Sequence, residues 1–250
     1  VGAAILAIAF LVKAGMWPLC FWLPTTYAAA SPPVACMFVI LTKVGAYVVL
    51  RLWLLLFGND IGSAAQFGGE WLLIGGLATV AFGVIGTLAA QDMARLGAFS
   101  VLVSAGTLLA AIGMGQIGVT SGALYYLISS TLGIAAFFLL VELVERGREP
   151  GADVLAVTRE AYGEDDAAEE ETEEVGIAIP VTMGVLGLAF LACGLLVAGL
   201  PPFPAFIAKF ALLSAATGTT GAPASASWVF LAMLIVSGLP AIIAIAPAGV

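Results

Sequence analysis

Histidine is missing from the 250-residue chain, and charged side chains of both signs together make up only 10% of it. The absence of histidine excludes a histidine-ligated metal site, and no other metal or cofactor is indicated. A soluble domain carries about 25% charged residues. With 62% hydrophobic residues, this chain cannot cover a water-facing surface with polar groups. The composition therefore predicts that the lipid bilayer is its solvent.

Cysteine is also scarce, and the three that occur lie in apolar stretches without C-x-x-C spacing: Cys20, Cys36 and Cys193. We interpret them as small apolar residues rather than as redox or metal-binding groups. No nucleophile, metal-ligand or nucleotide-binding motif is recognisable. An enzyme with its own active site is therefore the least favoured class.

Acidic charge is concentrated in one part of the chain. The net charge is −8, and thirteen of the sixteen acidic residues lie between Glu142 and Glu174. The rest is nearly neutral, so no nucleic-acid partner is indicated. The block EDDAAEEETEE at 164–174 should repel itself and stay solvated. We expect 144–176 to form a flexible acidic loop, with a hidden catalytic carboxylate pair as the less favoured alternative.

Long apolar stretches predict an all-α, polytopic bundle of transmembrane helices. About 20 apolar residues cross a hydrocarbon core of about 30 Å, and helices satisfy their backbone polar groups within each segment. The stretch 181–200 lacks the alternation of a barrel strand. A start at Val1, without a signal-peptide pattern, predicts a piece of a longer protein. We expect seven spans, at about 1–28, 34–57, 71–90, 96–115, 120–143, 177–216 and 227–247.

Proline interrupts two of these spans. The first is broken near Gly15 and Pro18, and the sixth at Pro201, Pro202 and Pro204. Proline removes a backbone donor and clashes with the preceding turn. In a membrane such a break persists only where protein or a wet cavity satisfies the freed groups. Paired broken helices often mark a transport site; a helix–loop–helix with a surface loop is the alternative.

Arginine in the connections predicts the orientation in the membrane. Arg95 and the arginines of the acidic segment fall on one side. We therefore expect that side, including 144–176, to be cytoplasmic in a multi-pass protein of the cell membrane. The connections on the other side contain no lysine or arginine: 58–69, 116–119 and 217–226.

Lysine occurs only inside hydrophobic spans, at Lys13, Lys43 and Lys209. A charge at the bilayer centre costs about 2.5–3.5 kcal/mol on insertion scales. Burial disfavours the charged form of an amine, so such a lysine can load and release a proton. The alternative is snorkelling to the interface. Their spans hold no acidic residue, so a partner carboxylate would lie outside this sequence or on another subunit.

Hydroxyl side chains in the fourth and fifth spans form a possible polar path beside the lysines. The alternative is that each hydroxyl only bonds the backbone of its own helix. The candidates are Ser100, Ser104, Ser129, Ser130 and Thr131.

Several stretches resemble the D-type subunit of Mrp/Pha-type multisubunit sodium or potassium/proton antiporters, which is related to the antiporter-like subunits of respiratory complex I. The resemblance begins with KAGMWPLCFWLPTTYAAASPPVA at 13–35 and LTKVGAYVVLR at 41–51. It continues in order through 91–113, 122–140 and 199–213.

The resemblance implies an antiporter-like fold with inverted repeats. The chain would hold the end of the first repeat (1–57), three helices of the second (58–143), the acidic loop (144–176), and the broken and last helices of the second (177–250). The family's lysines fall on Lys13, Lys43 and Lys209, and the glutamate paired with the first lies upstream. The chain departs from the family at Ser129, often histidine, and at Pro204-Ala205, often Ser-Gly.

The implied function is proton translocation within a Na⁺ or K⁺/proton antiporter complex, with other membrane subunits as partners. Lys13 would exchange a proton with the upstream carboxylate, Lys43 would relay it, and Lys209 would gate exit. One alternative is a proton-pumping membrane subunit of a redox-driven complex, such as complex I or a membrane hydrogenase, which would make it part of a translocase. Another is a scaffold subunit that no longer transports.

Overall fold

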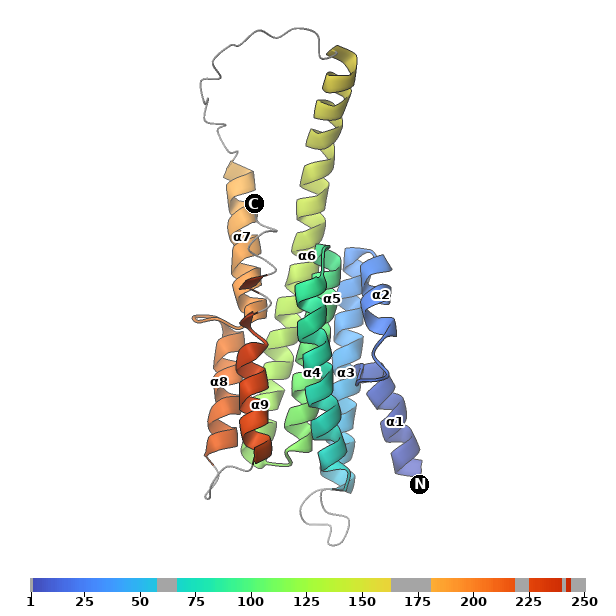
Figure 1. Ribbon diagram of the computed structural model, residues 1–250, viewed down its shortest axis with the longest axis vertical. Helices are drawn as coiled ribbons and strands as arrows, with labels where there is room; N and C mark the ends of the chain where they lie inside the picture. The colour runs from blue at the N-terminus through green and yellow to red at the C-terminus, as the bar shows by residue number, and fades with distance from the viewer. Residues whose placement is uncertain (1, 58–66, 163–180, 219–224, 240–241, 244–250) are drawn as a thin grey trace.

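The computed structural model describes the chain except for residues 1, 58–66, 163–180, 219–224, 240–241 and 244–250. Regular secondary structure in the described residues is helical throughout, which confirms the all-α prediction. The helices are α1 (Gly2–Ala14), α2 (Trp22–Ala29), α3 (Pro32–Leu56), α4 (Gly69–Ala89), α5 (Met93–Gly113), α6 (Ile117–Tyr162), α7 (Val181–Ala198), α8 (Pro204–Thr217) and α9 (Ser225–Val236). They form an elongated bundle (Figure 1).

Among the described residues, four helices are long and apolar enough to cross a membrane: α3, α4, α5 and the Ile117–Val144 part of α6. At a rise of about 1.5 Å per residue, the 21 residues of α4 or α5 extend about 30 Å. This length matches the hydrocarbon core. Shorter apolar helices occur within α1, α7, α8 and α9.

Helix α5 forms the centre of the bundle and packs against α2, α3, α4 and α6. Most of its side chains are buried. It approaches α4 closely because glycines face each other: a Cβ placed on Gly106 would lie 2.8 Å from the Gly76 carbonyl oxygen. Small residues allow such close packing between membrane helices, where association depends on van der Waals contact and hydrogen bonds.

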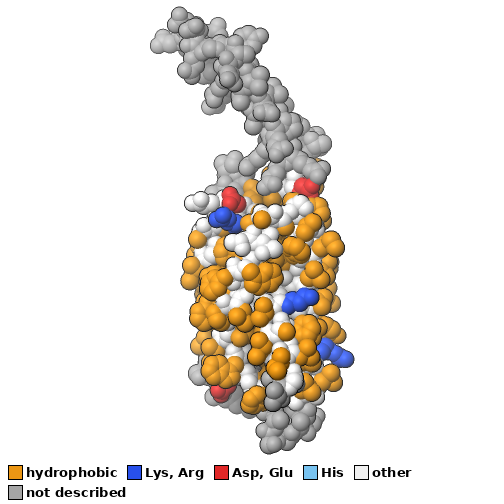
Figure 2. Space-filling view, turned by 90° about the vertical axis from the view of Figure 1, so that its right-hand side faces the viewer, with side chains coloured by type: hydrophobic (Ala, Val, Ile, Leu, Met, Phe, Trp, Pro, Cys, Tyr) orange, Lys and Arg blue, Asp and Glu red, His pale blue; other side chains and the backbone are white. Residues whose placement is uncertain are grey.

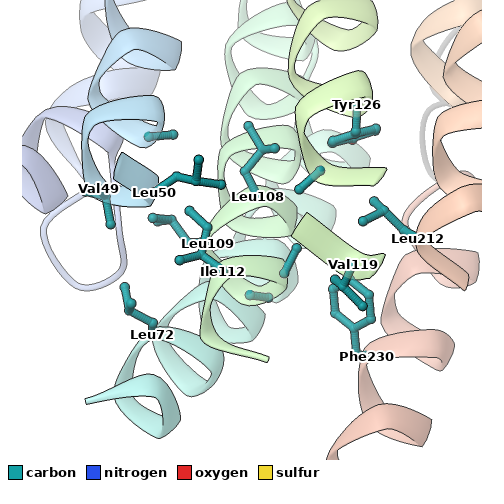
Figure 3. Close-up of a cluster of buried hydrophobic side chains, with 14 of the residues drawn as sticks. Val49, Leu50, Leu72, Leu108, Leu109, Ile112, Val119, Tyr126, Leu212 and Phe230 are labelled. Carbon is teal, nitrogen blue, oxygen red and sulfur yellow. The ribbon is translucent and has the colours of Figure 1, made fainter. Parts of the chain in front are cut away.

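The buried hydrophobic cluster around the lower half of α5 joins both ends of the chain. Leu108, Leu109 and Ile112 of α5 lie among side chains from α3, α4, α6, α8 and α9, including Leu50 and Phe230 (Figure 3). These contacts hold α8 and α9 against the rest of the bundle. The position of each broken helix relative to α5 is therefore fixed by packing.

The two predicted interruptions are present in the fold. The first broken helix consists of α1 and α2, and the second of α7 and α8. The two run in opposite directions along the bundle (Figure 1). This antiparallel arrangement is the one that an inverted repeat produces.

The expectation that 144–176 is a loop is wrong for its first part, because α6 continues without interruption to Tyr162. Extending a formed helix avoids the cost of nucleation, so the fifth span can propagate beyond its apolar residues. The remainder, 163–176, lies outside the described residues.

Hydrophobic side chains dominate the visible surface, and charged side chains are few (Figure 2). Trp71, for example, is 76% exposed and Ile117 is 80% exposed. Exposed apolar area of this extent needs a covering of lipid or protein. Together with the long apolar helices, it supports a multi-pass membrane protein.

Candidate functional site

The first break lies between the end of α1 at Ala14 and the start of α2 at Trp22. Gly15 has a φ of 76°, a left-handed conformation that glycine adopts at little cost. The freed Trp17 N–H donates a hydrogen bond to Thr79 Oγ1 of α4 at 2.8 Å. A neighbouring helix therefore satisfies part of the backbone that the Pro18 interruption exposes, as a membrane interior requires.

Lys13 is exposed in the part of the chain that the structure describes. The reason is that α1 contacts α3 on one side, with no further substantial helix contact in the described bundle. Its stem runs beside Gly45 of α3, where an added Cβ would lie 3.2 Å from Lys13 Cγ. Its place in the last turn of α1 suits the negative end of the helix dipole.

Lys43 is almost completely buried, at 2% exposed, in the middle of α3. Its Nζ donates a hydrogen bond to Ser104 Oγ of α5 at 2.5 Å. The Ser104 hydroxyl in turn donates to the Val101 carbonyl oxygen at 2.8 Å. This amine is therefore bonded to a neutral hydroxyl, which gives it much weaker support for a positive charge than a carboxylate would.

Lys209 is buried on α8, at 9% exposed, directly beside the second break. Its Nζ donates a hydrogen bond to the carbonyl oxygen of Ala198, the last residue of α7, at 2.8 Å. The last carbonyls of a helix lack partners within that helix, and the helix dipole favours a cation there. Lys209 thus satisfies the C-terminus of the half-helix that precedes it.

A small cavity lined in part by hydroxyl groups lies between Lys209 and Ser104, the hydrogen-bond partner of Lys43. Its volume of about 20 Å³ is close to what one water molecule requires. Lys209 lines it directly, whereas Lys43 reaches it through Ser104. The other polar lining residues come from α4, α5, α6 and the turn directly after α9: Thr87, Ser100, Tyr126, Ser130 and Ser237.

The structure divides the predicted hydroxyl path. Ser100, Ser104 and Ser130 line the cavity, whereas Ser129 and Thr131 are not among its lining residues. All five hydroxyls donate to carbonyls of their own helix, as the alternative interpretation expected. Ser104 bonds its own helix and also belongs to the predicted path, because its oxygen accepts a hydrogen bond from Lys43. A conducting role for these hydroxyls stays a prediction.

Sequence reasoning missed Thr87, Tyr126 and Ser237 as cavity residues. Thr87 and Ser237 bond carbonyls of their own chain segment, at Gly83 and Leu234. Nothing in their local sequence separates them from hydroxyls that face lipid. Only the packing of α4 and α9 against the bundle turns them toward Lys209.

Two broken helices that run in opposite directions, with Lys209 lining a cavity that Lys43 reaches through Ser104, form the arrangement expected of an inverted-repeat membrane fold. The family model described as "NADH:quinone oxidoreductase/Mrp antiporter, TM" matches residues 1–239, and the chain belongs to that family.

Two relatives support the assignment, and a solved structure supports the fold. The chain is 62% identical to the D subunit of a probable K⁺/H⁺ antiporter of Rhizobium meliloti (strain 1021), over 100% of this chain and 47% of that protein. It is 30% identical to the D subunit of a Na⁺/H⁺ antiporter of Bacillus subtilis (strain 168), over 82% of this chain and 37% of that protein. The fold matches one chain of the Mrp complex of Dietzia sp. DQ12-45-1b with a TM-score of 0.71 at 23% identity. The match covers 96% of this chain and 40% of that chain. The chain thus spans about half the length of the curated relatives it matches.

Proposed function

We propose that this chain carries part of the proton pathway of a monovalent cation/proton antiporter. The observation that carries the proposal is the polar connection from Lys43 through Ser104 and the cavity to Lys209. Both amines are buried, and the connection between them contains hydroxyl groups. Such an arrangement favours proton transfer, because hydroxyls and water both accept and donate hydrogen bonds.

In this mechanism Lys43 releases a proton toward Ser104 and water in the cavity, and Lys209 takes it up. Each lysine is neutral for part of the cycle, which burial without a carboxylate partner favours. Lys13 receives the proton before Lys43, from a carboxylate outside this sequence. Its position on the outer face of α1, beside Gly45 of α3, leaves it accessible to such a partner.

The transported cation is Na⁺ or K⁺. The 62%-identical relative is named as a probable K⁺/H⁺ antiporter subunit, which favours K⁺. The partners are other membrane subunits of the antiporter complex, in the cell membrane. The exposed apolar surface seen in Figure 2 provides area for both subunits and lipid.

The decisive experiment replaces Lys43 in the assembled complex and measures cation-driven proton flux in membrane vesicles. Lys43→Ala removes the titrating amine, and Lys43→Arg keeps a charge that effectively never deprotonates. Both variants should lose flux while still co-purifying with the other subunits. Arg51→Ala is the matched control, because Arg51 is an exposed cation on the same helix. Normal flux with arginine at position 43 would contradict the relay.

Two other functions remain testable by the same material. A proton-pumping subunit of a redox-driven complex would co-purify with quinone-reactive and iron–sulfur subunits instead of small antiporter subunits. A scaffold subunit would give a complex whose flux is unchanged by any lysine substitution.

We also infer that the α4–α5 connection faces the cytoplasm, because Arg95 lies beside it. Gln91 and Ile117 are both exposed and lie beyond opposite ends of α5. Cysteines introduced there, in a background lacking Cys20, Cys36 and Cys193, should label from opposite sides. Only Gln91→Cys should react from the cytoplasm; labelling of both from one side would contradict the topology.

A further inference from the structure

The side chain of Lys209 lies between two spaces. On one side is the small cavity that Ser104 also lines. On the other is a largely apolar groove of about 260 Å³ between α7, α8 and the end of α9, which Ala198, Gly199 and Gly238 help to line. Lys209 and the carbonyl to which it bonds therefore separate the interior of the bundle from its flank.

Two glycines leave room around that carbonyl. A Cβ on Gly199 would lie 2.9 Å from Lys209 Nζ. A Cβ on Gly238 would lie 3.0 Å from the Ala198 carbonyl oxygen and 3.7 Å from Lys209 Nζ. The absence of side chains at both positions keeps the carbonyl accessible to the amine and to any group that replaces it.

The carbonyl oxygen that Lys209 bonds, and a hydroxyl that lines the cavity beside Lys209, are oxygen ligands of the kind that alkali cations use. Carbonyl oxygens replace a cation's hydration shell in ion pathways, and the C-terminal ends of half-helices coordinate cations in carriers. Ser237, next to Gly238, lines the same cavity as Lys209. Its hydroxyl proton is directed to the Leu234 carbonyl at 2.7 Å, so its oxygen lone pairs remain for a cation.

We propose that the transported monovalent cation binds at the Ala198 carbonyl and the Ser237 hydroxyl, in competition with the ammonium of Lys209. When Lys209 gives its proton to water in the cavity, the neutral amine leaves the carbonyl and the cation takes its place. When the amine is protonated again, the ammonium displaces the cation. The proposal rests on the antiport function of the preceding section and gives it a coupling site.

The transported cation and the Lys209 ammonium cannot occupy the site together, because both are positively charged. Of the titratable groups on the helices packed against α8, only Tyr126 of α6 lines the cavity beside Lys209, and neither space is lined by a carboxylate among the described residues. Two unit positive charges in adjacent positions repel strongly, and the repulsion is stronger in a buried site than in water. With no lining carboxylate to offset this, the site accepts one cation or one ammonium, and exchange follows.

The first test alters the proposed cation site and leaves Lys209 itself unsubstituted. Gly238→Ala places a methyl group against the Ala198 carbonyl, and Ser237→Ala removes a ligand at little change in volume. In the assembled complex, the half-saturating K⁺ concentration for proton flux should rise at least tenfold in Gly238→Ala and severalfold in Ser237→Ala. Gly187→Ala is the matched control, because a Cβ on this α7 glycine meets nothing within 4 Å. If either variant assembles and keeps the parent's K⁺ dependence, the site is wrong.

The second test measures binding of ⁸⁶Rb⁺, as a K⁺ analogue, to the purified complex across pH. Binding to the parent should weaken as pH falls, because the ammonium returns to the carbonyl. Lys209→Gln should still bind ⁸⁶Rb⁺, but its binding should no longer depend on pH. Lys43→Ala should lose proton flux and keep the parent's pH dependence of ⁸⁶Rb⁺ binding. Unchanged pH dependence in Lys209→Gln would overturn the competition even when parental antiport is normal. Absence of any cation-driven flux in the parent would overturn the antiport function and this site together.

Discussion

The two broken helices have similar sequences but use their lysines differently. Aligned at Gly15 and Gly199, which share a φ of 76°, both breaks place a proline three residues later, at Pro18 and Pro202. The lysines do not align. Lys13 precedes its glycine by two residues, whereas Lys209 follows its glycine by ten.

This offset changes what each lysine can do. In the first break, Thr79 of α4 satisfies the freed Trp17 N–H, and Lys13 remains on the outer face. In the second, Lys209 turns back to bond Ala198 of the preceding half-helix. The same type of interruption thus leaves one lysine accessible to a partner and commits the other to the break itself. We predict that the two sites do different work in one pathway.

The largest effect should come from removing the accessible lysine. Lys13→Ala removes the proton carrier that we place at the entry of the pathway, and cation-driven proton flux should fall to background. Lys13→Arg preserves any structural ion pair but does not release its proton, so flux should fail there too. Co-purification of the complex checks assembly. If arginine at position 13 transports as well as lysine, Lys13 is a structural charge and the two breaks differ less than we propose.

Glycine substitutions at the two breaks should have unequal effects on transport. Gly199→Ala directs a methyl group onto the amine of Lys209, whereas Gly15→Ala directs one onto the side chains of Leu23 and Leu102. Both variants incur about 1–2 kcal/mol for a left-handed L-residue. Flux per assembled complex should fall about tenfold or more in Gly199→Ala and less in Gly15→Ala. Equal losses would indicate that backbone strain, rather than displacement of Lys209, limits transport.

The breaks are predictable from sequence because glycine and proline restrict the backbone locally. The burial of Lys43 is also predictable, since it lies in the middle of a long apolar segment. Exposure of Lys13 is not, because it depends on which helices pack beside α1. The continuation of α6 to Tyr162 escapes prediction because the change from apolar to charged residues marks the end of a span but not the end of a helix. Thr87 and Ser237 cannot be found from sequence, because tertiary packing sets the direction in which they face.

A smaller effect should follow removal of the hydrogen bond that supports the first break. Thr79→Val keeps the side-chain shape and deletes the acceptor of the Trp17 N–H. This donor is partly buried, and leaving a fully buried donor unsatisfied costs about 1–3 kcal/mol, so the midpoint of thermal unfolding in detergent should fall by up to a few degrees. Thr131→Val is the matched control, because that hydroxyl bonds only its own helix at Leu127. An equal shift in both variants would show that Thr79 has no special role at the break.

The smallest effect should come from replacing the acidic block at 164–174. This replacement tests whether the two breaks function with only their partners inside the bundle. Their freed groups have partners within the bundle, at Thr79 for the first and Lys209 for the second. The sequence predicts that the acidic block stays solvated, and charges in water are screened over about 8 Å at physiological salt. Replacing 164–174 by a neutral flexible linker of the same length should therefore leave flux within about twofold of the parent. The helical part of α6 to Tyr162 stays intact in this variant, so assembly is preserved. Loss of flux in a normally assembled complex would mean that the acidic block supplies protons or cations to the pathway, and that neither break works from its internal partners alone.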